Sequence, residues 1–426
     1  MNQQNDNSIL NRNSNDVNYA QFSQKQWDVI FIITVCVLIL VSIYSVAVNN
    51  FTPDQFLYLA KNLATGKLSV DDMPLNYPDY VIWNGHIYLP AGPFPAIILI
   101  PFLPLLEIGL YAGWISLFFS GINMWLFSKV LSIIEIDSER RKWILLLFFG
   151  GTVYFGVSTT MISWYFAHIL VTTCLLLCLL MVLKTEKPIA ILIGAILGLA
   201  VATRFSTLFA FPAFAWLLWK KENQGTGKIQ DYLYRIQNIL RLFIGLFILI
   251  IILFFYNYIR FGNIFETGYG IDVVGSKALY EARSYGLFSV FHIPRNLFIL
   301  IFQGPLPHPD LLSPVFSFPY IQPSPLGMGI LFTSPAVIYA FRADTKKSLV
   351  QASWLGVGFI LIPLLTHYGT GWIQFGFRYS LDFMPFLVIT AAYGLPKKMS
   401  NISRCLIILS VLINLWGTAW LHSWLY

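Results

Sequence analysis

Long apolar runs alternate with short polar segments along most of the chain. A run of about 20 apolar residues is long enough to cross the hydrocarbon core of a bilayer as a helix. The pattern predicts an all-α polytopic membrane protein with about eleven transmembrane helices. Nine of these helices are read from runs at residues 29–48, 110–134, 143–160, 166–183, 238–256, 327–341, 349–366, 381–396 and 404–421.

The segment 189–219 supplies the other two predicted helices. Basic residues flank it on both sides, with Lys187 before it and Lys220 after it. As one helix it would reach about 46 Å, well beyond the roughly 30 Å hydrocarbon core. We therefore predict a hairpin of two short spans with Arg204 near its tip. The alternative is a single tilted helix, which would invert the orientation of everything that follows.

Basic residues set the predicted orientation. On this reading eight of the 27 lysines and arginines face one side, namely Lys61, Lys67, Arg204, Arg260, Lys277, Arg283, Arg295 and Arg378. The other 19 lie toward the N-terminal side, which the positive-inside rule places in the cytoplasm. The long loops 49–109 and 257–326 then face outward. Prolines break the apolar part of the first loop, which predicts short interfacial helices there.

Composition supports a membrane protein. Hydrophobic residues make up 57% of the 426 residues and charged residues only 11%, whereas soluble domains carry about 25% charge. A water-soluble enzyme, a disordered protein and a nucleic-acid-binding module are excluded despite the net charge of +7. We predict a polar cytoplasmic tail over residues 1–28 and one membrane domain over 29–426, with no separate soluble domain. The four cysteines lie in apolar runs and are expected to be buried, with no disulfide or zinc site.

Ionisable residues near membrane spans are costly and usually functional, and they gather in the predicted outer loops. Asp54 follows the first span and Pro53, at the start of a segment with helical apolar spacing. It is either a helix-capping residue or a general base or metal ligand at the membrane surface. Arg204 is either an arginine that extends to lipid headgroups or a phosphate ligand. Trp164 and His168 lie at a span end, where an aromatic belt and a structural histidine are the alternatives to a catalytic role.

Two outer segments are dense in polar and aromatic residues. The first, YNYIRFGNIFETGYG, carries Arg260, Glu266 and Tyr269, in which Arg260 and Glu266 either pair with each other or line a sugar or phosphate pocket. The second, HYGTGWIQFGFRYSLDFMPF, carries the residues Trp372, Arg378, Tyr379 and Asp382. Arg378 and Asp382 are four residues apart, so an ion pair on one helix face is the alternative to ligand binding. We favour a binding role, because three nearby glycines let the backbone approach a ligand closely. No Walker A loop, dinucleotide fingerprint or HExxH motif is present.

The order of these segments resembles the GT-C superfamily of integral membrane glycosyltransferases. Within it, the likeness is to bacterial members related to protein O-mannosyltransferases and lipid A aminoarabinose transferases. The matching pieces are the Asp54 helix with Tyr58, Leu59 and Ala60, then NGHIYLPAGPFPAIILIPFLPL, GLAVATRFSTLFAFP, YNYIRFGNIFETGY, GILFTSPAV and FGFRYSLDFMPF. They run over almost the whole chain.

The resemblance implies a glycosyltransferase of the bacterial plasma membrane, active on its extracytoplasmic face. It would transfer a hexose or pentose from a polyprenyl-phosphate carrier to a lipid, glycan or protein acceptor, with inversion. Asp54 matches the family's first-loop Asp, a base or a ligand of Mg²⁺ or Mn²⁺. Many relatives have Asp-Glu where this chain has Asp54-Gln55. The donor phosphate is assigned to Arg378 and Arg204. The predicted pocket residues are Tyr58, Trp164, His168, Arg260, Glu266, Tyr269, Trp372, Tyr379 and Asp382.

Three other readings stay open at this point. A transporter or flippase for a lipid-linked sugar explains the spans, but it predicts an inverted repeat that is not visible. A glycan polymerase or ligase of another fold would use outer-loop Arg and His without Asp54. A structural membrane subunit would not need so many ionisable residues in the outer loops. In each reading the partners include membrane lipids and exclude nucleic acid.

Overall fold

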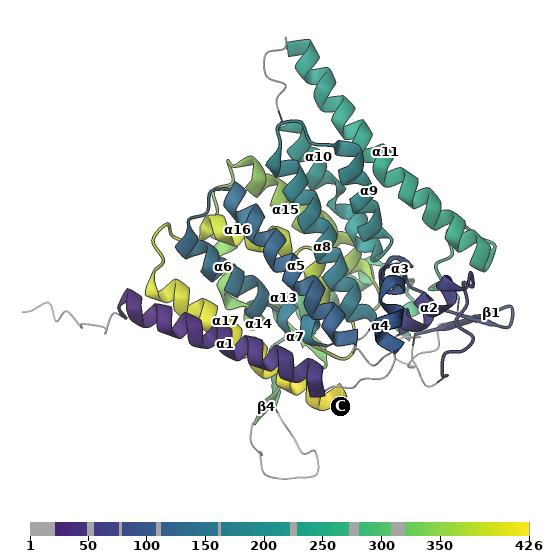
Figure 1. The fold of residues 1–426 in the computed structure, drawn as a ribbon, viewed down its shortest axis with the longest axis horizontal. Coiled ribbons are helices and arrows are strands. Elements are labelled where there is room, and N and C mark those ends of the chain that lie inside the picture. The colour runs from purple at the N-terminus through teal and green to yellow at the C-terminus, as the bar shows by residue number, and fades with distance from the viewer. Residues whose placement is uncertain are drawn as a thin grey trace, which may run out of the picture.

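The computed structural model describes residues 22–48, 55–75, 79–107, 112–160, 163–221, 228–271, 281–307 and 320–425. Most of these residues are helical, which confirms the main part of the predicted fold class (Figure 1). Within these described ranges, six helices are long and apolar enough to cross a membrane. They are α1 (Gln24–Val48), α5 (Ala112–Ile133), α8 (Ser163–Lys184), α11 (Lys228–Phe261), α15 (Ser348–Thr366) and α17 (Asn401–Leu425).

Shorter elements complete the bundle. Between α5 and α11 they are α6 (Ser138–Gly150), α7 (Tyr154–Thr159), α9 (Ala190–Val201), the 3-10 helix η2 (Phe205–Ala210) and α10 (Phe211–Trp219). After α11 they are η3 (Val290–His292), α13 (Ile293–Ile301), α14 (Ile330–Thr333), η4 (Pro335–Arg342), η5 (Arg378–Asp382) and α16 (Met384–Gly394). The strands in this half are β3 (Leu306–Pro307), β4 (Ile321–Gln322), β5 (Leu326–Met328) and β6 (Gln374–Gly376).

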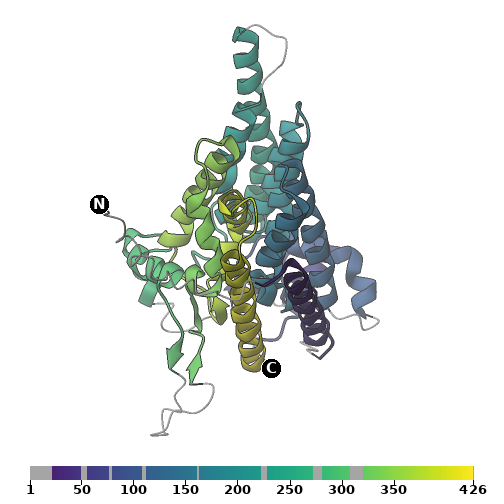
Figure 2. The same cartoon turned by 90° about the vertical axis from the view of Figure 1, so that its left-hand side faces the viewer.

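Helix α8 lies in the middle of the bundle, whereas α1 and α11 lie at its periphery (Figure 1). Helix α1 runs beside α17, as both views show (Figure 2). The peripheral helices expose large apolar side chains, among them Ile33 and Leu40 on α1 and Ile252 and Phe255 on α11. Such faces are stable against lipid tails, where burial within the protein is not required. The prediction that all four cysteines are buried is wrong for Cys36 on α1 and Cys405 on α17, which are exposed. An apolar run on a peripheral helix can face lipid tails instead of the protein core.

The predicted hairpin is present, and the chain reverses at Arg204. Near the end of α9, Gly198 packs against Leu249 of α11. At the end of α10, the carbonyl oxygen of Trp219 accepts a hydrogen bond from Arg235 of α11 at 2.9 Å. Arg235 precedes Leu249 by about 21 Å along a helix. The chain has therefore returned toward the N-terminus of α11, and the single tilted helix is wrong.

Two predicted spans are broken. The run 143–160 is divided between α6 and α7, because the turn after Gly150 packs closely against the rest of the bundle. A side chain at Gly151 would lie 3.0 Å from Ser410 on α17. The run 327–341 is divided between α14 and the 3-10 helix η4, where Pro335 cannot continue the preceding α-helical hydrogen bonds.

The first long loop folds into short elements. They are α2 (Gln55–Ala64), the hairpin of β1 (Val81–Trp83) and β2 (His86–Tyr88), α3 (Phe94–Leu99), η1 (Ile100–Phe102) and α4 (Leu103–Glu107). The short helices agree with the prediction. The strands do not, and the fold is not purely α. Asn84 and Gly85 both have positive φ, at 50° and 81°, which is the turn that an Asn-Gly pair gives to a two-residue hairpin. Two further pairs are antiparallel β3–β4 and parallel β5–β6.

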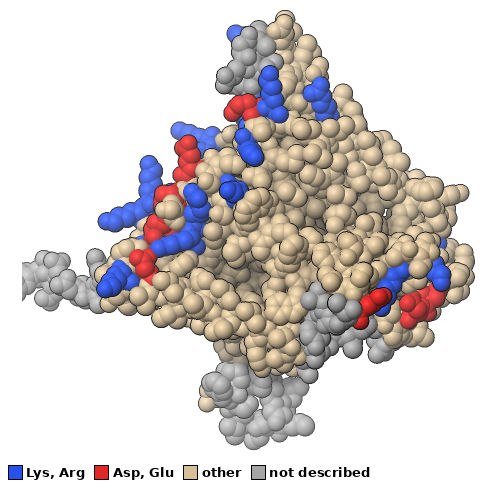
Figure 3. All heavy atoms as spheres, in the orientation of Figure 1, with Lys and Arg blue, Asp and Glu red and all other residues tan. Residues whose placement is uncertain are grey.

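Charged side chains gather at two edges of the molecule (Figure 3). One edge, which we call the basic end, carries the N-termini of α1, α6 and α11. The other edge, which we call the loop end, carries α2 and β1. The face seen between them is almost free of Lys, Arg, Asp and Glu. A charge-free belt between two charged edges is the surface that a bilayer requires.

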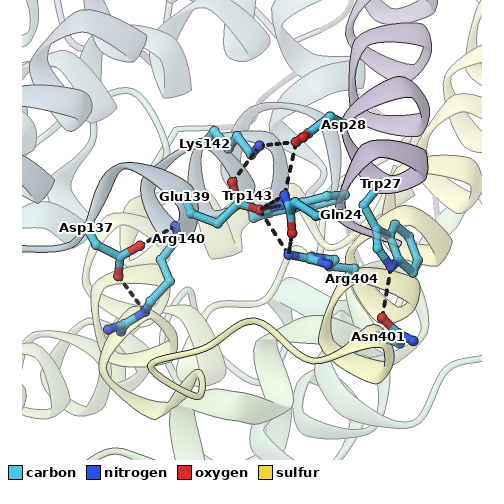
Figure 4. Close-up of polar contacts among 10 residues, drawn as sticks. All are labelled: Gln24, Trp27, Asp28, Asp137, Glu139, Arg140, Lys142, Trp143, Asn401 and Arg404. Carbon is cyan, nitrogen blue, oxygen red and sulfur yellow. Dashed lines mark hydrogen bonds and ion pairs between the residues drawn. The ribbon is translucent and has the colours of Figure 1, made fainter. Parts of the chain in front are cut away.

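A polar network ties three helices together at the basic end (Figure 4). Lys142 of α6 places its Nζ atom 2.6 Å from Asp28 Oδ1 and 2.5 Å from Glu139 Oε2. Arg404 of α17 donates from Nη2 to Gln24 Oε1 at 2.6 Å and to Glu139 Oε1 at 3.0 Å. The network joins α1, α6 and α17 far from the loop end.

Candidate functional site

The candidate site is built around Asp382, the last residue of η5. The sequence FGFRYSLDFMPF forms strand β6, a 3-10 turn and then α16, which has Pro385 in its first turn. Proline suits a first helical turn, because its missing N–H has no partner there anyway. The 3-10 turn ends just before α16, and Asp382 at its end is fully buried.

The Asp382 carboxylate is surrounded by three side chains from two distant segments, α8 and the turn after α9. Arg204 donates from Nε to Oδ1 at 2.8 Å and to Oδ2 at 3.0 Å. Ser206 donates its hydroxyl to Oδ2 at 2.5 Å, and His168 Nδ1 lies 3.1 Å from Oδ1. A buried carboxylate needs this degree of hydrogen bonding to remain charged. The structure thus brings together three of the predicted site residues, Arg204, His168 and Asp382, and adds Ser206.

Asp382 fixes the position of the Arg204 guanidinium. Arg204 follows α9 in an extended conformation, and Asp382 binds it only through Nε. Its Nη1 and Nη2 atoms have no hydrogen-bond partner within the part of the chain that the structure describes, and the side chain remains 17% exposed. The two terminal nitrogens are therefore oriented and open to a ligand.

Arg378 lies near the same tyrosine as Arg204. The Arg204 guanidinium carbon is 4.7 Å from the ring centre of Tyr379, and that of Arg378 is 5.3 Å from it. Arg378 also lies 5.1 Å from the ring of Tyr165. It is only 4% exposed and donates weakly from Nη1 to the carbonyl oxygen of Ile373 at 3.3 Å, while its buried Nε atom has no partner.

The predicted alternative of an Arg378–Asp382 ion pair is wrong. The two residues lie in a 3-10 helix, which has three residues per turn, so positions four apart point about 120° away from each other. Asp382 pairs with Arg204 instead. Among the described residues this is the one carboxylate that forms an ion pair with either guanidinium. Two positively charged guanidinium groups thus lie beside Tyr379, and only one of them is paired with a carboxylate. The excess positive charge and the free N–H donors are suited to binding an anion.

Arg260 and Glu266 do not pair with each other. Arg260 donates to the carbonyl oxygen of Leu89 at 2.8 Å and to Asn257 Oδ1 at 2.9 Å. Glu266 accepts the backbone N–H groups of residues 268 and 270 at 2.7 and 2.9 Å. Arg260 therefore ties the first long loop to the end of α11, and Glu266 shapes the turn that presents Tyr269. Both act as scaffold for this part of the loop end.

The other predicted pocket residues are more dispersed. Tyr58 is half-buried on α2 in an apolar cluster with Phe56 and Leu59. Trp164 is half-buried against the core at the start of α8, and Trp372 is 58% exposed. Asp54, the predicted base or metal ligand, lies outside the described residues. Within the described residues no three His, Cys, Asp or Glu side chains come together as a metal site.

A carboxyl group that the sequence reasoning missed is Asp79, between α2 and β1. It is half-buried and has a left-handed backbone, with φ of 59°, which Asp tolerates better than most residues. Burial raises the pKa of its carboxyl, and the positive charge of Arg378 offsets part of that rise. Burial is the main cause of the raised pKa of Tyr269 and of Tyr368, the latter reaching about 12, and the Asp79 charge adds to both. The signal available in the sequence was only an acidic residue after Pro78 in the first long loop.

Comparisons of the chain with family models, with curated proteins and with solved structures find no match. The arrangement offers two guanidinium groups, those of Arg204 and Arg378, to an anion, and the charge of Arg378 acts on the Asp79 carboxyl. Both features lie where a bundle of apolar helices meets its loop end.

Proposed function

We propose that the protein is an integral membrane glycosyltransferase of the GT-C type. It would move a sugar from a polyprenyl-phosphate carrier to a lipid, glycan or protein acceptor outside the plasma membrane of a bacterium. The observation that carries the proposal is the pair of guanidinium groups at Tyr379, with the terminal nitrogens of Arg204 held open by Asp382. Bidentate guanidinium groups are well matched to phosphate oxygens.

The location of this pair favours a lipid-linked donor. Arg204 lies at the turn of the α9–α10 hairpin, and Arg378 lies in the turn before α16. A phosphate bound there could keep its polyprenyl chain against the apolar faces of the bundle. The basic end would face the cytoplasm by the positive-inside rule, and the loop end would face outward, with about eleven spans between them.

The proposed reaction is a single displacement, as the resemblance to GT-C enzymes implies. The acceptor oxygen bonds to the anomeric carbon as the bond from that carbon to the phosphate oxygen breaks, so the configuration inverts. The electron pair leaves with the phosphate, and Arg204 and Arg378 stabilise the negative charge that develops on it. A carboxylate takes the proton of the acceptor hydroxyl. Asp54 is the sequence-based candidate for this role, or for holding a Mg²⁺ or Mn²⁺ ion. Tyr269 and Trp372 offer aromatic surfaces for the sugar rings.

Mass spectrometry of envelope glycans and glycolipids tests the proposal. Cells with the gene, without it, and with Arg378→Met or Asp54→Asn are compared. One glycan should lack a single sugar in the deletion strain and in the Arg378→Met strain. The matched control is Arg342→Met, which changes an exposed arginine of η4 outside the candidate site. Unchanged glycans in the deletion strain would contradict the proposal. A wild-type pattern in Asp54→Asn, with altered glycans in the deletion, would remove Asp54 from the chemistry.

A further inference from the structure

Asp79 is placed at the loop end by contacts that join the two long loops. The residues that follow it, Tyr80 and Val81, are 6% and 0% exposed. Strand β1 pairs with β2, and the carbonyl oxygen of Leu89, one residue after β2, accepts a hydrogen bond from Arg260 at the end of α11. The ring of Tyr88 packs at 5.4 Å against that of Phe261. The Asp79 backbone is thus anchored on a hairpin fixed to the bundle.

The second long loop completes the surroundings of Asp79. Gly268 packs against Pro90, close to the hairpin, and the turn held by Glu266 presents Tyr269 from there. The ring of Tyr269 lies 6.5 Å from that of His367, beside Tyr368. The exit of the same hairpin reaches the candidate site, because the Phe94 N–H donates to the carbonyl oxygen of Ala202, two residues before Arg204, at 3.3 Å. The charged and titratable groups whose electrostatics involve Asp79 are Arg378, Tyr269 and Tyr368.

Asp79 differs from Asp382 in what its carboxyl group does. Asp382 is fully buried, and both of its oxygens accept hydrogen bonds, so it holds a guanidinium and has no free electron pair aimed at a ligand. Asp79 is half-buried, and its carboxyl forms no hydrogen bond or ion pair with any residue in the described ranges. The positive charge of Arg378 acts on this carboxyl.

On the basis of the proposed function, we propose that Asp79 is the general base of the transfer. Its carboxylate takes the proton of the acceptor hydroxyl while the oxygen of that hydroxyl bonds to the anomeric carbon. The bond from that carbon to the phosphate oxygen breaks, and Arg204 and Arg378 hold the leaving phosphate. Asp79 ends the step protonated and returns the proton to solvent. Asp54, directly before α2, is then left as a helix-capping residue or a metal ligand.

Burial supports this role because it brings the pKa of Asp79 closer to neutral pH, where a carboxylate is a more effective base. A carboxyl that must be ionised gives a rate that falls as the pH falls through its pKa. The removal of a general base lowers a rate by about 100-fold or more.

The experiment uses membranes isolated from the cells described above, which contain both the native donor and the native acceptor. The rate of sugar transfer is measured across a pH series for wild type, Asp79→Asn and Asp79→Glu. The matched control is Asp72→Asn, an exposed carboxyl of the same loop that accepts a hydrogen bond from Asn62. We expect Asp79→Asn to transfer about 100-fold more slowly or worse, with no fall in the residual rate at acid pH. Asp79→Glu should keep that fall at a shifted pH, and Asp72→Asn should behave as wild type.

Two results would overturn the assignment. One is an Asp79→Asn variant that keeps the acid fall in rate, since Asp79 would then be a structural residue. The other is an Asp54→Asn variant that loses the fall while Asp79→Asn keeps it, which would make Asp54 the base. Failure of the proposed function is seen separately, as equal product in wild-type and deletion membranes.

A measurement that needs no sugar transfer tests the environment of Asp79 separately from the proposed reaction. Infrared difference spectra of the purified protein, recorded during a pH titration, should show a protonated carboxyl band that titrates above the usual range of Asp. The band should be absent from Asp79→Asn and present in Asp72→Asn. Its presence in Asp79→Asn would contradict the proposed environment of Asp79, whatever reaction the protein catalyses.

Discussion

Replacement of Asp382 by asparagine is the sharpest perturbation of the candidate site. Asparagine keeps the shape of the side chain but removes the charge that Arg204 contacts at 2.8 and 3.0 Å. Because Asp382 is fully buried, the change leaves a guanidinium without its counter-ion in a poorly solvated place. Loss of one partner of a buried ion pair costs about 3–5 kcal/mol. Ser206→Ala removes one hydrogen bond to the same carboxylate and should cost about 1.5–3 kcal/mol.

The assay is the unfolding of the purified protein in mixed micelles of increasing denaturing detergent, followed by circular dichroism. A double-mutant cycle with Arg204→Met isolates the pair. In the double variant no charge is left unpaired, so its loss of stability should fall well short of the sum of the two single losses. Coupling of neighbouring charged residues is typically about 0.5–3 kcal/mol. Losses that add to within about 0.5 kcal/mol would refute the reasoning that Asp382 and Arg204 form one buried unit.

Four further predictions address other parts of the molecule. Arg378→Met should weaken the binding of polyprenyl phosphate to the protein in lipid nanodiscs by about 10- to 100-fold, the effect of losing charge-assisted hydrogen bonds worth about 1.5–3 kcal/mol. Gly245→Ala should lower the free energy of unfolding by about 1–3 kcal/mol or more, because the added carbon would lie 2.0 Å from a backbone oxygen of α9. The control is Gly358→Ala, whose added carbon meets no atom within 4 Å and should be tolerated. Burial lowers the pKa of His367 to about 4, so the unfolded chain binds the extra proton more readily. The stability that neutral His367 contributes above about pH 6.5 is therefore lost as the pH falls toward 4. In a pH series of unfolding measurements, His367→Gln should lose less stability than the wild type over this range. Glu139→Gln removes a partner of Lys142 and Arg404 and should lower the free energy of unfolding by about 1 kcal/mol at low salt, seen as a modestly lower melting temperature. Sugar transfer in isolated membranes should not change, because this network lies at the basic end.

Much of the fold was predictable from hydrophobic runs. Their lengths located the six long helices, and the basic residues around 189–219 indicated the hairpin correctly. The breaks at Gly150 and Pro335 were not predicted, because a run of apolar residues does not reveal a close helix crossing or a proline that ends an α-helix within it. The β1–β2 hairpin had a local signal in Asn84-Gly85, but the apolar segment that follows obscured it.

The candidate site was predictable only in part, because its contacts join residues that are far apart in the chain. Asp382 lies 178 positions from Arg204 and 214 from His168. Sequence spacing instead favoured a pair between Arg378 and Asp382, and only the 3-10 geometry of η5 separates them. Asp79 had no helical spacing or motif to mark it. Its proximity to Arg378 depends on the way the two long loops are joined through Arg260.

The measurement that tests the central claim most directly is donor binding by the paired guanidinium groups. Purified protein in lipid nanodiscs is titrated with polyprenyl phosphate, and the wild type is compared with Arg204→Met, Arg378→Met and the double variant, with Arg342→Met as control. Saturable binding that weakens in each single variant and disappears in the double variant is the predicted result. Equal affinity in all five proteins, or no saturable binding by the wild type, would contradict the account.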